Sequence, residues 1–175
     1  MTAHMEAAAA IRKELGDAAA PEVAIVLGSG LGALAEQVED AVRISYDRIP
    51  GFQLPTVAGH KGELVFGRLR GHRVVCQSGR FHMYEGHSAP VSVLPVRTFG
   101  ELGAGTLIVT NAAGAVNRTF GPGTVMLITD HLNLSGRTPL EGPVVAGEER
   151  FPDMSDPYDA GLRALAQGVA EREGL

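Results

Sequence analysis

The chain has 175 residues, of which 45% are hydrophobic and 20% charged, with a formal net charge of −5. This length and composition suffice for one globular domain with a sizeable core. The basic residues form no cationic run, so the sequence offers no electrostatic footprint for nucleic acid. No apolar stretch reaches the roughly 18 residues that span a bilayer, and the first residues are typical of an amphipathic helix rather than a signal peptide. We therefore expect no nucleic-acid partner and no membrane association.

Cys76 is the single cysteine of the chain, so no internal disulfide can form. It lies in an apolar run over residues 74–76, which favours a buried, unreactive thiol over a reactive one. A chain without disulfides suits a reducing compartment, and we expect a cytoplasmic protein. No group of cysteines and histidines has the spacing of a zinc site, so we expect no structural zinc.

In the first half of the chain, helical and strand patterns alternate. Residues 7–15 have the apolar spacing of a helix, and residues 23–27 form a short apolar run typical of a buried strand. The elements expected next are a helix over residues 31–38, strands over residues 42–46, 63–69 and 73–77, and a loop over residues 49–62.

In the second half, residues 88–102 predict a helix in which Pro90 fits the first turn and Pro95 introduces a kink. Residues 106–110 predict a buried strand. The remaining elements expected are a strand over residues 124–129, a long functional or interface loop over residues 137–152, and a helix over residues 158–172. This alternation predicts an α/β fold with a mixed sheet, in one domain over residues 1–175.

The most informative segment covers residues 77–86, where an arginine, a histidine, a tyrosine and a glutamate are crowded between glycines. A guanidinium is a planar fork of N–H donors that matches phosphate or carboxylate oxygens two at a time. In an extended chain, residues two positions apart project to the same side, so Arg80, His82 and Tyr84 would line one face. This pattern indicates a binding site for an oxyanion, with Tyr84 reaching toward a neighbouring hydroxyl group.

A glycine-rich segment over residues 28–32 follows a predicted strand and opens a predicted helix. Its glycines let the backbone approach a ligand closely, and N–H groups at a helix start favour an anion. Ser29 adds a hydroxyl donor. Two other interpretations stay open: a tight turn without a ligand, and a dinucleotide site, for which Ala33 and Asp47 give a loose match.

Three further segments carry candidate residues. His60 lies on a glycine-flanked loop, where it is either solvated or brought over a bound anion. Residues 110–115 follow a predicted strand, and ligands in open α/β sheets bind outside such strand ends. Their small side chains leave room for a flat or sugar-like ligand, although a close-packed turn would have the same composition. Asp130 and His131 follow another predicted strand, and we assign them a structural role.

Taken together, these segments resemble the trimeric purine nucleoside phosphorylases that are specific for 6-oxopurines. The matching segments follow the family order over nearly the whole chain and are residues 28–32, 50–52, 59–60, 79–86, 110–114, 130–133 and 150–155. The stretches around Arg80 and Asn111 are the most specific, and together they outweigh the dinucleotide match. The related methylthioadenosine phosphorylases usually differ at Ser29 and at residues 111–113, so the resemblance points away from them.

The resemblance implies a twisted mixed sheet flanked by helices in a three-layer sandwich, and a pentosyltransferase of purine salvage. Its reaction is the phosphorolysis of purine ribonucleosides or deoxyribonucleosides, such as inosine and guanosine, to free base and (deoxy)ribose 1-phosphate. Phosphate is a co-substrate, and neither a cofactor nor a metal is implied. The family match assigns phosphate binding to Ser29, His60, Arg80, His82 and the backbone at Ala112, with Arg80 and His82 catalytic, and ribose binding to Tyr84 and Phe151. Glu85 would support the site by pairing with His82 or Arg80.

Phe151 would pack over the sugar in the site of a neighbouring subunit, so the resemblance also implies a functional homotrimer. Family members continue well past the equivalent of Leu175, and the segments that hold the purine have no counterpart in this sequence. We therefore expect the N-terminal portion of a phosphorylase, with an unpaired edge left on its sheet. The alternatives that stay open are a non-catalytic phosphate-binding or assembly module, and a nucleoside hydrolase or another glycosyl transferase.

Overall fold

The computed structural model describes residues 1–16, 20–54 and 61–175. Two compact units divide the chain, Met1–Ala113 and Gly114–Leu175, and we call them the first unit and the second unit. The first unit holds a mixed sheet with helices packed on it, and the second unit holds a helix and irregular chain. None of the helices in the described part of the chain has both the length and the apolar character needed to cross a membrane.

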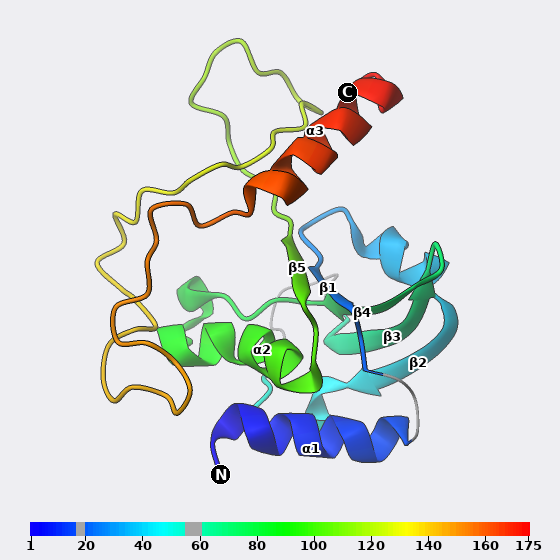
Figure 1. The fold of residues 1–175 in the computed structure, drawn as a ribbon, viewed down its shortest axis with the longest axis vertical. Coiled ribbons are helices and arrows are strands. Elements are labelled where there is room, and N and C mark those ends of the chain that lie inside the picture. The colour runs from blue at the N-terminus through cyan, green and yellow to red at the C-terminus, as the bar shows by residue number, and fades with distance from the viewer. Residues whose placement is uncertain (17–19, 55–60) are drawn as a thin grey trace. The chain divides into compact units, whose positions relative to one another are not determined.

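The sheet of the first unit has the strand order β2-β3-β4-β1-β5 among the described residues (Figure 1). Its strands are β1 (Val23–Val26), β2 (Glu39–Ser45), β3 (Glu63–Leu69), β4 (His72–Ser78) and β5 (Thr106–Val109). β1 runs parallel to both β4 and β5, whereas β2, β3 and β4 pair in antiparallel order. The predicted mixed sheet is therefore confirmed, and the carboxyl ends of β1, β4 and β5 meet at one edge.

The two faces of the sheet carry separate hydrophobic clusters, because side chains alternate along each strand. Leu64 and Phe66 of β3 belong to the larger cluster, while Val65 between them belongs to the smaller one. Cys76 of β4 is fully buried in the smaller cluster, as the apolar run around it predicts. Burial raises the pKa of its thiol to about 11, so the group stays protonated and unreactive at neutral pH.

Helices cover the larger cluster. α1 (Ala3–Leu15) buries Ile11 there, and α2 (Ala89–Leu102) buries Phe99 and lies against α1 (Figure 1). The predicted helices over these segments are confirmed, and Pro95 lies inside α2 as expected. On the opposite face, a short 3-10 helix, η1 (Gly32–Gln37), adds a single buried residue to the smaller cluster.

β5 forms one edge of the sheet and, within the described residues, pairs with β1 alone. The predicted strand is confirmed, but its predicted burial is wrong, since Leu107, Ile108 and Val109 are 43%, 47% and 41% exposed. An apolar run looks alike in an edge strand and in a central strand, because periodicity does not report which neighbours cover the strand. One side of β5 thus has no partner strand among the described residues.

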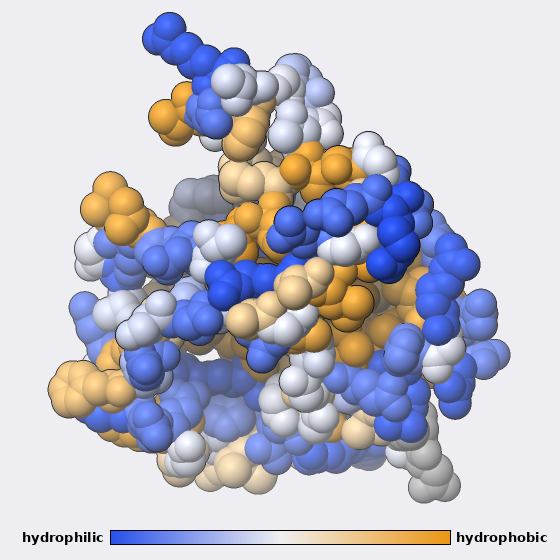
Figure 2. Space-filling model, turned by 45° about the horizontal axis from the view of Figure 1, so that its top comes forward, coloured by the Kyte–Doolittle hydropathy of each residue, from blue (hydrophilic) through white to orange (hydrophobic). Residues whose placement is uncertain are grey.

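The second unit, all of whose residues are described, contains no buried residue. Its helix α3 (Ala160–Glu173) begins at Asp159, whose carboxylate accepts a hydrogen bond from the Leu162 N–H at 2.8 Å. Phe151 is 87% exposed, and Figure 2 shows other apolar residues, in orange, that also reach the molecular surface. The predicted helix is confirmed here, and so is the irregular path of residues 137–152.

The predicted strand over residues 124–129 is wrong, because this stretch is irregular and no residue of the second unit is in a strand. A strand needs a neighbouring strand for its backbone hydrogen bonds, and the sequence of a single segment does not reveal whether one is present. Val125, Met126 and Leu127 are 69%, 58% and 47% exposed, so the apolar run that motivated the prediction has no covering layer.

Candidate functional site

Three of the predicted site segments begin where parallel strands end. Ser29 follows β1, Arg80 follows β4 and Ala112 follows β5. The register pairs Val26 with both Gln77 and Val109, so these three strand ends are aligned at the same edge of the sheet. This is the place where open α/β sheets bind ligands, and all three segments belong to the first unit.

Thr110 joins the segment after β1 to the segment after β5. Its hydroxyl accepts a hydrogen bond from the Gly28 N–H at 2.7 Å and donates one to the Val26 carbonyl at 2.8 Å. Its own N–H donates to the same carbonyl at 3.1 Å. A Cβ atom on Gly28 would lie 2.7 Å from the Cα of Asn111, so only glycine allows the two backbones to approach this closely.

Arg80 extends from the segment after β4 toward the same edge. It is half-buried, and its Nη1 lies 3.5 Å from the Thr110 carbonyl, at the outer limit for a hydrogen bond. Its Nε–H is buried and has no acceptor among the described residues. A buried donor without a partner is costly, and an anion bound at this edge would supply the missing acceptor.

Buried side chains donate hydrogen bonds to the turn that precedes Arg80 and so fix its backbone. The Gly79 carbonyl accepts hydrogen bonds from the Tyr46 hydroxyl at 2.6 Å and from the Gln77 side-chain amide at 3.1 Å. Burial raises the pKa of Tyr46 well above its ordinary value, so the hydroxyl remains a donor. The Tyr46 ring also packs edge-on against Phe52 and Phe81, with centroids 5.3 and 5.4 Å away, and this fixes the backbone on both sides of Arg80.

His82 and Tyr84 lie together, although the segment is not extended as the spacing argument assumed. Residues Met83–Glu85 form a short 3-10 helix, η3, and the rings of His82 and Tyr84 stack with centroids 4.6 Å apart. The two rings can stack because η3 begins directly after His82 and its tight turn folds Tyr84 back toward that residue. Tyr84 is 74% exposed, which leaves its hydroxyl accessible to a ligand.

Glu85 supports His82 through reciprocal hydrogen bonds. The Glu85 carboxylate accepts from the backbone N–H of His82 at 3.1 Å, and a ring nitrogen of His82 accepts from the backbone N–H of Glu85. These reciprocal bonds hold His82 and its ring at the start of η3.

The helical segment expected over residues 31–38 is found after β1, but as a short 3-10 helix. This helix, η1, has six residues and no side-chain N-cap. So short a helix has little dipole, and an anion near Ser29 would depend on the N–H groups of the turn and on the serine hydroxyl instead. Ser29 is exposed, and Gly30 has φ +86°, a conformation that favours glycine.

The other predicted site residues are His60, Ala112 and Phe151. His60 lies outside the described residues. Ala112 is exposed at the carboxyl edge, and Phe151 is an exposed residue of the second unit. Within the described ranges, no three His, Cys, Asp or Glu side chains gather as they would around a metal ion.

Sequence reasoning gave no role to Thr110 or Tyr46, which organise the site. Thr110 stands directly after an apolar run, and a hydroxyl at a strand end is the one local signal that could have drawn attention to it. Tyr46 is 33 residues away from the carbonyl that it binds. No local pattern predicts such a contact, because it depends on the pairing of β2, β3 and β4.

The sequence of residues 22–175 matches the Phosphorylase superfamily. The chain belongs to this superfamily. Purine nucleoside phosphorylase 1 of Geobacillus stearothermophilus is 51% identical over 156 residues, which are 89% of this chain and 57% of that protein. Purine nucleoside phosphorylase of Bos taurus is 48% identical over 161 residues, or 88% of this chain and 55% of that protein. The chain thus spans a little more than half the length of these curated relatives.

Solved structures of the superfamily have the same fold as this chain. Schistosoma mansoni purine nucleoside phosphorylase in a complex with BCX-34 gives a TM-score of 0.88 at 42% identity, covering 99% of this chain and 66% of that one. A purine nucleoside phosphorylase in complex with ribose-1-phosphate gives 0.89 at 43% identity, with the same coverage. The family resemblance and the fold class expected from the sequence are therefore confirmed.

Proposed function

We propose that this chain carries the phosphate site and part of the ribose site of a purine nucleoside phosphorylase. The enzyme transfers the pentosyl group of a purine ribonucleoside or deoxyribonucleoside, such as inosine or guanosine, to phosphate. The observation that carries the proposal is the buried Nε–H of Arg80, which has no acceptor among the described residues. Arg80 lies at the carboxyl edge of the sheet, where its Nη1 approaches the Thr110 carbonyl. The names of the relatives, and the ribose-1-phosphate bound in one solved neighbour, support it.

In the proposed mechanism, phosphate accepts hydrogen bonds from Arg80, from His82 and from the turn at Ser29. His60 and the backbone at Ala112 complete the phosphate site. As the glycosidic bond stretches, positive charge develops on the sugar, and a phosphate anion fixed beside the anomeric carbon stabilises it. A phosphate oxygen then bonds to the anomeric carbon, while the electron pair of the broken bond leaves with the base, which takes up the proton that the hydrogen phosphate loses.

The ribose and subunit contacts belong to the same proposal. The exposed Tyr84 hydroxyl binds a sugar hydroxyl, and the exposed Phe151 ring packs over the sugar in the site of a neighbouring subunit. An oligomer follows from this arrangement, because each site is incomplete without the adjacent chain, and the family resemblance implies that it is a homotrimer. The reaction needs no cofactor besides phosphate as co-substrate. The lone buried thiol of Cys76 suits the cytoplasm.

The decisive variant is Arg80→Ala, with phosphate affinity measured by calorimetry. Losing charge-assisted hydrogen bonds worth roughly 1.5–3 kcal/mol each should weaken phosphate binding at least about tenfold. The matched control is Arg68→Ala, because Arg68 is an exposed arginine of β3 whose guanidinium bonds only to the local Gly71 carbonyl among the described residues. Equal phosphate affinity in wild type and Arg80→Ala would refute the phosphate site.

Inosine cleavage with and without phosphate separates the alternatives. Phosphate-dependent release of hypoxanthine supports phosphorolysis, whereas release without phosphate would identify a hydrolase. Phosphate binding that depends on Arg80, without any release of base, would identify a non-catalytic phosphate-binding module.

A further inference from the structure

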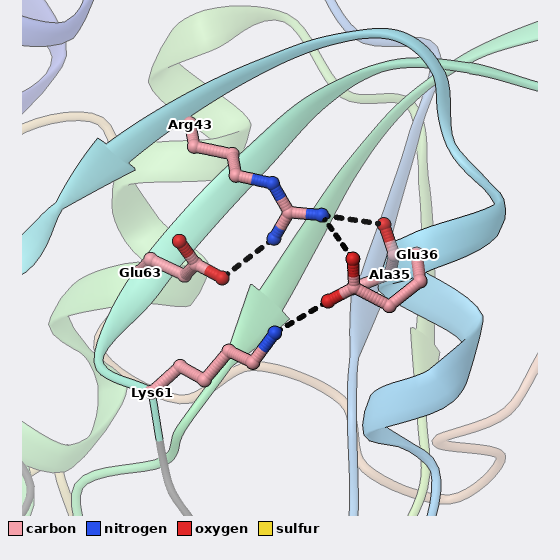
Figure 3. Close-up of polar contacts among 5 residues, drawn as sticks. All are labelled: Ala35, Glu36, Arg43, Lys61 and Glu63. Atoms are coloured by element: carbon pink, nitrogen blue, oxygen red, sulfur yellow. Dashed lines mark hydrogen bonds and ion pairs between the residues drawn. The ribbon is translucent and has the colours of Figure 1, made fainter.

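A network of four charged side chains lies on the surface of the first unit, and Figure 3 shows it in close-up. Glu36 accepts from Arg43 Nη2 at 2.8 Å with one carboxylate oxygen, and from Lys61 Nζ at 2.5 Å with the other. Arg43 Nη1 also donates to Glu63 at 2.7 Å. We call Glu36, Arg43, Lys61 and Glu63 the charge network. It contains two positive and two negative groups, so it is neutral as a whole.

The charge network ties η1 to the antiparallel ribbon of β2 and β3. Glu36 belongs to η1, Arg43 to β2, and Glu63 begins β3. Arg43 faces Val65 across the ribbon, which puts Glu63 on the diagonal, within reach of a long side chain. Arg43 Nη2 also approaches the Ala35 carbonyl at 3.4 Å, so one guanidinium holds both the backbone and a side chain of η1.

Besides the charge network, two side chains of η1 fix its orientation: Ala35 is buried in the smaller cluster, and the partly buried Leu34 packs against it. Hydrogen bonds in 3-10 helices have poor geometry, neither end of η1 has a side-chain cap, and Ala35 is its single buried residue. Backbone bonds also connect η1 to the site: the Leu31 N–H donates to the Gly28 carbonyl at 3.1 Å, and the Leu34 N–H donates to the Leu31 carbonyl at 3.0 Å. A shift of η1 therefore moves the turn that carries Ser29.

We propose that Glu36 is a positioning residue, which holds η1 through Arg43 and Lys61 and thereby fixes the turn over residues 28–31 for anion binding. The anion-binding part of this inference rests on the proposed function. A single exposed ion pair contributes little, but one carboxylate shared by two cations costs less ordering per bond than separate pairs do. The hydrogen bond from Lys61 lowers the pKa of Glu36, so the carboxylate is charged at neutral pH.

The sign of the effect distinguishes positioning from simple electrostatics. Glu36 is negative, so removing its charge by Glu36→Gln makes the surroundings of the site more positive. Through the electrostatic field alone, this change would strengthen phosphate binding. A positioning role predicts the opposite result, because the loosened turn presents its N–H groups and the Ser29 hydroxyl less well.

The test compares wild type with Glu36→Gln by hydrogen exchange over residues 28–37 and by calorimetric titration with inorganic phosphate. We expect exchange to accelerate, and phosphate affinity to fall, each about three- to fivefold, the upper end of what exposed ion pairs contribute. Glu14→Gln is the matched control, since Glu14 is an α1 carboxylate that pairs with Arg48 at 2.6 Å. It should leave both readings unchanged.

Lys61→Arg should behave like wild type, whereas Lys61→Met should accelerate exchange in the same peptides. Unchanged exchange in Glu36→Gln would overturn the inference, and so would tighter phosphate binding. If wild type binds no phosphate, the proposed function fails, and hydrogen exchange alone still decides whether Glu36 holds η1.

Discussion

The two units of this chain differ in how much apolar surface they bury. The first unit has a sheet with a hydrophobic cluster on each face, and Leu64, Val75 and Ile11 are fully buried in it. The second unit has a capped helix and many local turns, yet none of its residues is buried. Burial of apolar area is the main term that offsets the entropy of ordering a chain. We therefore expect the first unit to dominate the stability of the protein.

The candidate site divides in the same way. Ser29, Arg80, His82 and Tyr84 belong to the first unit, where the sheet and the buried Tyr46 fix their backbone. Phe151 belongs to the second unit, where local bonds shape its surroundings: the adjacent Arg150 guanidinium donates to the Leu140 carbonyl at 3.0 Å and to the Gly142 carbonyl at 2.6 Å. Ser29, Arg80, His82 and Tyr84 thus lie on a unit with a packed core, whereas Phe151 lies on a unit without one.

The strongest test of this contrast replaces one leucine in each unit. Leu64→Ala removes a fully buried side chain of β3 and should lower the free energy of unfolding by about 2–5 kcal/mol. Leu165→Ala removes a side chain of α3 that is 61% exposed, and should change it by less than about 0.5 kcal/mol. Urea unfolding followed by circular dichroism measures both. Equal losses would mean that the second unit depends on burial as much as the first.

A second pair of variants compares glycines. Gly28→Ala places a Cβ atom 2.7 Å from the Asn111 backbone, so we expect a loss of about 2–3 kcal/mol in unfolding free energy. Phosphate affinity should fall as well, because the Thr110 bridge is displaced. Gly114→Ala meets no atom within 4 Å and should be close to neutral. If both variants had the same melting temperature in thermal unfolding, the close approach of Gly28 to the Asn111 backbone would not limit which residue the position accepts.

The smallest effect concerns pH. Burial raises the pKa of Cys76 from 9.0 to about 11, so the thiol in the unfolded chain ionises first as pH rises. The stability contribution is complete below pH 9 and is lost as pH rises toward 11, with about 1 kcal/mol gone by pH 10. Cys76→Ala should lack this part of the alkaline slope. Identical slopes between pH 8 and pH 10 in urea unfolding would show that the thiol is not desolvated.

The sequence predicts much of the first unit because local patterns and tertiary packing agree there. The runs that become β1, β3 and β4 lie inside the sheet, so the interpretation of the first as a buried strand and of the other two as strands is correct. The apolar run over residues 124–129 looks similar but is irregular, because no neighbouring strand pairs with it. The exposed face of β5 was missed for the same reason: burial depends on distant parts of the chain.

The site follows the same division between local and distant information. Arg80 and Ser29 stand in short segments with unusual composition, so the sequence alone singles them out. Thr110, Tyr46 and Glu36 act through partners that are far away in the sequence, on strands or in helices that only the fold brings close. The short 3-10 form of η1 was also missed, since propensity alone does not distinguish it from an α-helix.

The exposed edge at β5 has a practical consequence for handling the protein. Leu107, Ile108 and Val109 combine high strand propensity with no charge, and backbone groups on the outer side of an edge strand can act as a template for another chain. The formal net charge of −5 opposes such association by repulsion. Added salt screens this repulsion, so the protein should scatter more light as ionic strength and concentration rise, and a lysine at Ile108 should keep its solutions clear.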